Sequence, residues 1–110
     1  MPADFWVEFR QKVKSLNSQA WIVGEIWGDA RPWLKGKHFD GVMNYRIGWS
    51  SLCWSAGNKL KKDYINPAYP INELASDRFI STLKETLDSY ARELATCQLN
   101  LLDSHDVPRA

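Results

Sequence analysis

The sequence has little of several features that mark special protein classes. Only two of its 110 residues are cysteines, Cys53 and Cys97. They lie far apart and form no CxxC motif, so we expect two buried free thiols rather than a metal pair or a disulfide framework. A run of about 20 apolar residues is also missing, so no membrane-spanning helix is expected. Residues 1–4 do not begin a basic and then apolar signal sequence, and a cytoplasmic location follows as the expectation.

An excess of charge of one sign is missing as well. Fourteen basic and thirteen acidic residues leave a formal net charge of +1. Such a chain has no electrostatic basis for binding nucleic acid or an anionic membrane surface. Hydrophobic residues make up 45% and charged residues 25%, which suits a globular protein and excludes disorder, collagen and a coiled coil. The length by itself suits one domain, residues 1–110.

Tryptophan, in contrast, is abundant, and all six tryptophans lie in the first half of the chain. Trp6 and Trp54 have helical spacing to other apolar residues and Trp21 opens a predicted strand, so we expect these three in the core. Trp27 and Trp33 lie on the carboxyl-terminal side of that strand, where packing and a flat platform for a ligand are equally good interpretations.

The hydrophobic pattern predicts helices alternating with short apolar strands. The spacing of apolar residues predicts helices over 4–17, capped by Asp4, over 48–62, and from Ser76 or Asp77 as far as Leu94. Continuous apolar runs predict strands over 20–27, 39–45 and 97–102. A loop is predicted over 28–38 and another over 66–70. Alternating strands and helices favour an α/β fold with a parallel sheet.

Polar side chains lie at or just beyond the carboxyl end of each predicted strand, which is where parallel α/β proteins place their chemistry. These are Glu25, Asn44 and the pair His105-Asp106. The apolar neighbours of Glu25 predict partial desolvation, which would raise its pKa as a general acid requires, while Asp106 would stay ionised more easily. Structural interpretations stay open: Glu25 in a salt bridge, Asn44 as a turn cap, and His105-Asp106 as a hydrogen-bonded turn, with Asp103 and Arg109 as a further ion pair.

Four segments resemble one enzyme family, in the order that the family has them. They are Asp-Phe-Trp-Val-Glu-Phe-Arg-Gln-Lys-Val-Lys at 4–14, Ile-Val-Gly-Glu-Ile-Trp at 22–27, Phe-Asp-Gly-Val-Met-Asn-Tyr at 39–45 and Asn-Leu-Leu-Asp-Ser-His-Asp-Val-Pro-Arg at 100–109. Together they resemble glycoside hydrolase family 13, the α-amylase family, and within it the cyclomaltodextrinase, neopullulanase and maltogenic amylase group. Residues 46–74 match least, and we assign them no function.

The resemblance implies part of a (β/α)8 TIM barrel: the helix after strand four, then strands five to seven with their helices. It implies Glu25 as general acid/base, Asp106 as the carboxylate that stabilises the transition state, and His105 as a contact to sugar hydroxyls. Trp27 and Asn44 would lie near the substrate cleft. The implied substrates are α-glucans such as maltooligosaccharides or cyclodextrins, and the chemistry needs no metal or organic cofactor.

The chain departs from the family at the nucleophile. The family uses an Asp at the end of strand four with an Arg two residues before it, and no Arg-x-Asp occurs here. Asp4 precedes a helix and cannot replace it, so we expect the motif upstream of Met1 and an isolated chain without activity. Three strands cannot close a barrel, which predicts exposed strand edges and self-association. The alternative is a non-catalytic carbohydrate-binding or scaffold module; a small metal enzyme built on Glu25, His105 and Asp106 lacks a second nearby histidine.

Overall fold

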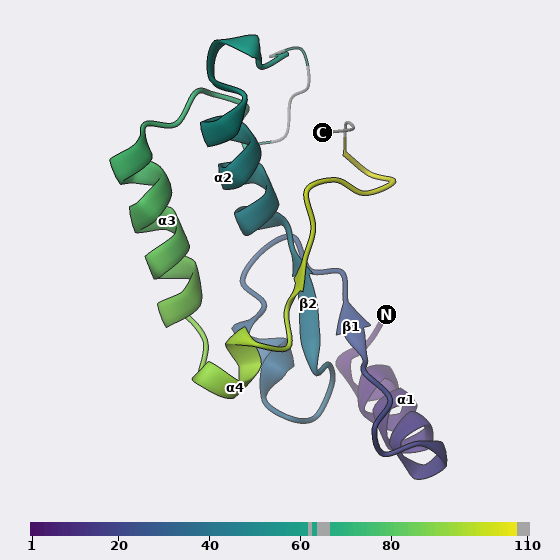
Figure 1. The fold of residues 1–110 in the computed structure, drawn as a ribbon. Helices are drawn as coiled ribbons and strands as arrows, with labels where there is room; N and C mark the ends of the chain where they lie inside the picture. Colours follow the sequence, from purple (N-terminus) through teal and green to yellow (C-terminus); the bar gives the residue numbers. More distant parts are fainter. Residues whose placement is uncertain (62, 64–66, 108–110) are drawn as a thin grey trace. The chain divides into compact units, whose positions relative to one another are not determined.

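A computed structural model describes residues 1–61, 63 and 67–107 of the chain. The predicted ion pair of Asp103 with Arg109 and the end of the 100–109 segment therefore lie outside the described residues, as do Lys62 and Asn66. Helices and strands alternate in the predicted order (Figure 1). The elements are α1 (Ala3–Leu16), β1 (Val23–Gly24), the 3₁₀ helix η1 (Arg31–Leu34), β2 (Gly41–Asn44), α2 (Tyr45–Ser55), the 3₁₀ helix η2 (Gly57–Lys59), α3 (Ser76–Asp88), α4 (Arg92–Ala95) and β3 (Leu99–Asn100).

The strands form one sheet in the order β1-β2-β3. β1 and β2 are parallel, as the alternation of strands and helices predicts. Val23 lies opposite Gly41, and Gly24 lies opposite Val42. The chain divides into two compact units inside β2 and β3. The first unit holds Met1–Met43 and Ala91–Leu99, and the second holds Asn44–Tyr90 and the residues from Asn100 onward.

All three strands are shorter than predicted, and β1 shows why. The backbone of residues 20–22, just before β1, forms hydrogen bonds with side chains and does not continue the strand-to-strand ladder. The Lys14 ammonium donates to the Ala20 carbonyl at 2.6 Å, and the Ile22 amide donates to the Asp40 carboxylate at 2.9 Å. Apolar runs therefore located the strands correctly, but they overestimated their length.

The helix boundaries also differ from the prediction. Asp4 does not cap α1: Pro2 is the N-cap residue, without a side-chain hydrogen bond, and Asp4 lies in the first turn. α2 begins at Tyr45 because β2 runs directly into it, and Gly57, with a φ of +51°, follows its end. The predicted long helix is interrupted at Ala91, whose extended backbone (ψ 148°) separates α3 from α4.

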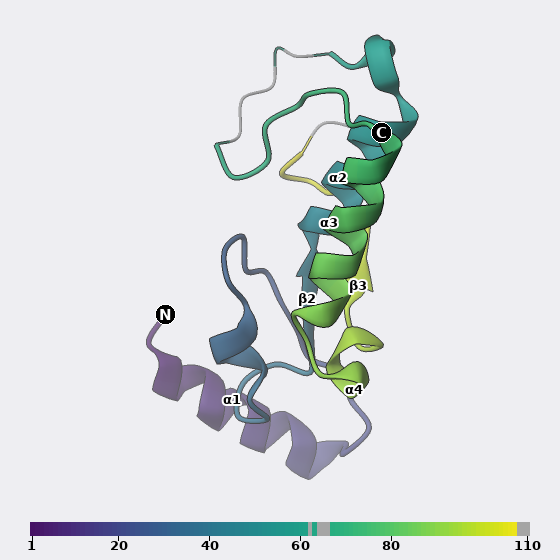
Figure 2. The ribbon, with the colours of Figure 1, turned by 90° about the vertical axis from the view of Figure 1, so that its left-hand side faces the viewer.

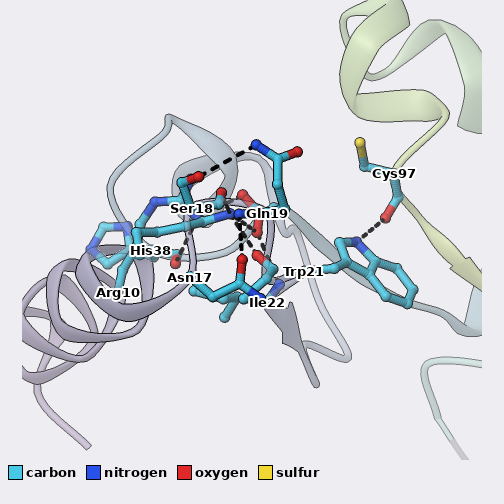
Figure 3. Close-up of polar contacts among 11 residues, drawn as sticks. Arg10, Asn17, Ser18, Gln19, Trp21, Ile22, His38 and Cys97 are labelled. Carbon is cyan, nitrogen blue, oxygen red and sulfur yellow. Dashed lines mark hydrogen bonds and ion pairs between the residues drawn. The ribbon is translucent and has the colours of Figure 1, made fainter.

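In the first unit, Asp40 connects α1 to the start of the sheet. Its carboxylate forms ion pairs with Arg10 at 2.7 Å and with Lys14 at 2.9 Å, besides accepting the Ile22 amide. Burial alone would raise the pKa of Asp40, but the hydrogen bonds from Lys14, Ile22 and Arg10 together hold it below its ordinary value. Arg10 also reaches the His38 carbonyl (Figure 3). This carboxylate is the main polar attachment of a helix that buries no residue completely.

We expect Asp40→Asn to loosen α1 at neutral pH and to matter less in acid. Because the folded-state pKa is lowered, the carboxylate stabilises the fold above its unfolded pKa of about 3.9, and this contribution is lost as pH falls through the lower folded-state pKa. Loss of the charge-assisted bonds should cost about 1 to 3 kcal/mol at pH 7. Protection factors of α1 amides at pH 7 and pH 3 measure this, with Glu8→Gln as the exposed control. An equal effect of Asp40→Asn at both pH values would contradict it.

In the second unit, α2 and α3 lie alongside each other (Figures 1 and 2). Cys53 and Ser50 of α2 and Thr82 and Thr86 of α3 are buried. Both cysteines are free, as predicted, although Cys97 of the first unit is only half-buried. Burial raises the pKa of the Cys53 thiol. None of the helices in the described residues is long and apolar enough to cross a membrane.

Candidate active site

Glu25 directly follows β1, and its position depends on the glycine before it. A Cβ at Gly24 would lie only 2.4 Å from the ring of Phe39, so the absent side chain lets that ring pack on the backbone. Phe39 is buried and stacks on Trp33, with ring centroids 5.9 Å apart. The backbone just before Glu25 therefore packs against the ring of Phe39, which is itself stacked on Trp33.

The predicted partial desolvation of Glu25 is wrong for this chain. Its side chain is exposed, whereas Gly24 is buried and Ile26 and Trp27 are half-buried. The backbone alternates sides on leaving β1, so the apolar neighbours in the sequence do not cover the carboxylate. The carboxylate at this strand end is therefore exposed to solvent.

A pocket of about 450 Å³ lies in the first unit between α1 and the β1 segment. Its lining is predominantly aromatic and aliphatic, and Glu25 contributes the carboxylate. The lining residues are Trp6, Phe9, Val13, Trp21, Ile22, Val23, Gly24, Glu25, Ile26 and Phe39. Phe9 and Trp21 are exposed, so part of this apolar lining faces solvent.

The tryptophans only partly follow the prediction. Trp21 and Trp54 are not core residues, since they are 51% and 45% exposed. The Trp21 indole donates to the Cys97 carbonyl at 3.0 Å (Figure 3), and Trp54 stacks on Phe79 with the planes 7° apart. Trp6 is half-buried against Phe39. Trp27 and Trp33 are half-buried, and the Trp33 ring also contacts His38.

Asn44 ends β2 and belongs to the second unit. It is buried, and its amide nitrogen donates to the Asn100 side-chain oxygen at 3.0 Å. Asn44 is the N-cap residue of α2 but forms no side-chain capping bond, so the proposed turn-cap role is wrong. Its polar group instead connects the end of β2 to β3.

His105 and Asp106 lie together in an exposed turn after β3. The His105 Nε2 is 3.4 Å from the Asp106 Oδ1, an ion pair when the imidazole is protonated. The Asp106 amide donates to the Ser104 hydroxyl at 3.2 Å, and that hydroxyl is 3.0 Å from the Tyr45 hydroxyl. Both side chains of the predicted pair are thus presented to solvent while the backbone between them is hydrogen-bonded.

Sequence reasoning missed three residues that support these positions. Asp40 lies in the segment 39–45 that resembles the family. Two features of the sequence could have revealed its role: it is the only carboxylate in that apolar segment, and Arg10 and Lys14 lie one turn apart on the predicted helix. Tyr45 and Ser104 gave no separate signal, because their contact joins residues 59 apart in the chain.

Comparison with known proteins supplies the family. The model of the α-amylase catalytic domain matches residues 2–110. A cyclomaltodextrinase from Geobacillus thermopakistaniensis and neopullulanase 2 from Thermoactinomyces vulgaris are each 41% identical over 105 residues. These alignments cover 96% of this chain but 16% of each relative. The chain therefore spans about a sixth of the length of these relatives.

Solved structures agree. A debranching enzyme from Nostoc punctiforme superposes with a TM-score of 0.88 at 38% identity, covering 98% of this chain and 23% of that one. The residues that the family model matches, 2–110, include Glu25, Asn44 and His105-Asp106. The chain belongs to the α-amylase family, by its catalytic domain.

Proposed function

We propose that this chain forms part of the catalytic barrel of a retaining glycoside hydrolase that acts on α-glucans. The observation that carries the proposal is Glu25: an exposed carboxylate directly after β1, in a chain that matches the catalytic-domain family from residue 2 onward. Active sites of β/α barrels lie at the carboxyl ends of the strands. In this proposal β1, β2 and β3 are barrel strands five, six and seven, and α1 is the helix after strand four.

The reaction then divides between two carboxylates and a histidine. Glu25 protonates the leaving glycosidic oxygen and later deprotonates the water that releases the sugar. Asp106 and His105 hold ring hydroxyls more tightly as the ring flattens toward the oxocarbenium-like transition state. Trp27 and Asn44 lie near the cleft. The exposure of Glu25, His105 and Asp106 supports this division, because each side chain is accessible to a sugar.

The nucleophile must come from another part of the barrel. A retaining glycosidase needs two carboxyl groups about 5 to 5.5 Å apart on opposite faces of the scissile bond. The family motif Arg-x-Asp does not occur in the 110 residues. We therefore propose that the chain acts only within a complete barrel, on α-1,4-glucosidic bonds of maltooligosaccharides or cyclodextrins, in the cytoplasm.

The first unit offers a surface through which the chain would join the rest of a barrel. β1 is at one edge of the sheet in the described residues, and the apolar pocket lies beside it. An edge strand next to exposed Phe9 and Trp21 favours pairing with another strand. We propose that a neighbouring barrel strand covers this edge, and that isolated chains cover it by self-association.

We expect the isolated chain to release no sugar from maltotriose, cyclodextrin or pullulan, because it has no nucleophile. Placed in the Geobacillus cyclomaltodextrinase instead of the aligned segment, it should give a chimaera that hydrolyses cyclodextrin. Reducing-sugar release measures both, and reinsertion of the relative's own segment is the control for assembly. A folded but inactive chimaera beside an active control would contradict the proposal. If the isolated chain then bound maltotriose and lost binding in His105→Ala, a non-catalytic binding module would be the better interpretation.

A further inference from the structure

The end of β3 and the segment leading from it into the His105-Asp106 turn approach the end of β2 and the first turn of α2 at three places. At the first, the Asn44 amide donates to Asn100 at 3.0 Å. At the second, Gly48 allows close approach: a Cβ there would lie 2.1 Å from the Leu101 carbonyl oxygen. The third is Tyr45, and it is the one nearest to the turn.

Tyr45 is the first residue of α2 and is buried. Its hydroxyl lies 3.0 Å from the half-buried Ser104 hydroxyl, and its ring lies 6.5 Å from the ring of Tyr69. A buried ring has few rotamers, so its hydroxyl is a fixed point at the end of a rigid helix. The contact with this buried hydroxyl therefore restrains the Ser104 side chain, two residues before Asp106.

Ser104 passes this restraint to the turn. Its oxygen accepts the Asp106 amide at 3.2 Å, which closes the Ser104–Asp106 turn. A serine hydroxyl can accept one hydrogen bond and exchange another with a second hydroxyl, so one oxygen satisfies both contacts. The Tyr45 hydroxyl thereby selects one Ser104 rotamer, and that rotamer fixes the backbone between His105 and Asp106.

We propose that Tyr45 is a positioning residue for His105 and Asp106 and that it acts through the Ser104 hydroxyl. This inference rests on the proposed function, since positioning matters for activity only if the two side chains hold substrate. The restraint itself is a property of the chain alone. Its loss affects transition-state contacts first, because hydroxyl contacts that tighten during the reaction need the more exact placement.

The kinetic test is a double-mutant cycle in the chimaera. Tyr45→Phe keeps the ring and removes the hydroxyl, and Ser104→Ala removes the partner. Each should lower kcat for cyclodextrin about three- to tenfold with little change in KM, the range for one hydrogen bond. The double variant should be no slower than either single one, and Ser104→Thr should restore most of the rate. Ser81→Ala on α3 is the control for loss of a hydroxyl elsewhere.

Amide hydrogen exchange in the 110-residue chain by itself, outside the chimaera, gives a readout that needs no activity. Exchange at Asp106 should be about three times faster, or more, in both variants. Ser104→Ala removes the oxygen that accepts the Asp106 amide, and Tyr45→Phe removes the hydroxyl that orients this oxygen. Unchanged exchange, or additive kinetic effects of the two variants, would overturn the inference. An inactive parent chimaera with faster Asp106 exchange in both variants would instead contradict only the proposed function.

Discussion

Glu25→Gln in the chimaera should lower kcat/KM for cyclodextrin by about 10² to 10⁴, the contribution of a well-placed general acid/base. The amide has the size of the carboxylate but can neither give nor take the proton at the glycosidic oxygen. Because Glu25 is exposed and follows β1 rather than packing inside it, the substitution should leave the thermal midpoint unchanged. The loss would therefore be one of chemistry and not of folding.

The matched control is Glu8→Gln, an identical change at an exposed position of α1. It should leave both kcat/KM and the thermal midpoint as they were. If Glu25→Gln retained more than a tenth of the activity, Glu25 would be one of the structural carboxylates that the sequence also allows. A lowered thermal midpoint in Glu25→Gln would point the same way.

Gly41→Ala should destabilise the sheet strongly. A Cβ at Gly41 would lie 1.9 Å from the Cys97 carbonyl oxygen and 2.8 Å from its carbon. These are backbone atoms, which cannot turn away as a side chain can, so the segment leading to β3 would have to move. Gly41 also pairs with Val23 of β1. Overpacking costs typically 1 to 3 kcal/mol, and we expect about 3 kcal/mol or more of the free energy of unfolding here.

Urea unfolding of the chimaera measures this effect, and Gly28→Ala provides the comparison. A Cβ at Gly28 would meet nothing within 4 Å, so that change should be within about 0.5 kcal/mol of neutral. Similar free energies of unfolding for the two variants would show that the Cys97 backbone can move away from Gly41 at little cost. That result would contradict the prediction.

The order of elements could be read from the sequence because it depends on local periodicity. The spacing of Phe5, Phe9 and Val13 located α1 to within one residue at each end. Strand lengths could not be read in the same way. The backbone around Ile22 is bound by the Asp40 carboxylate, a contact between residues 18 apart that no apolar run reveals. Gly57 likewise ended α2 earlier than the lysines at 59 and 61 suggested.

The candidate site was predictable for a different reason. Glu25 follows β1, Asn44 is the last residue of β2, and His105-Asp106 follow β3. Strand ends can be located without knowing side-chain contacts. Their surroundings were not predictable, since Glu25 is exposed despite Ile26 and Trp27 beside it. Solvent exposure depends on which side of the backbone each residue takes after β1. The support of Asp106 by Ser104 and Tyr45 depends on tertiary contacts between distant parts of the sequence.

The acid/base role of Glu25 is tested most directly by Glu25→Ala in the chimaera with an aryl α-maltoside whose leaving group needs no protonation. That substrate should lose far less activity than cyclodextrin does, because departure of the aryl group bypasses the missing acid. Added azide should raise the rate and give α-maltosyl azide, since an anion needs no base to attack the glycosyl-enzyme. Equal loss on both substrates, with no azide product, would contradict the assignment of Glu25 as the acid/base.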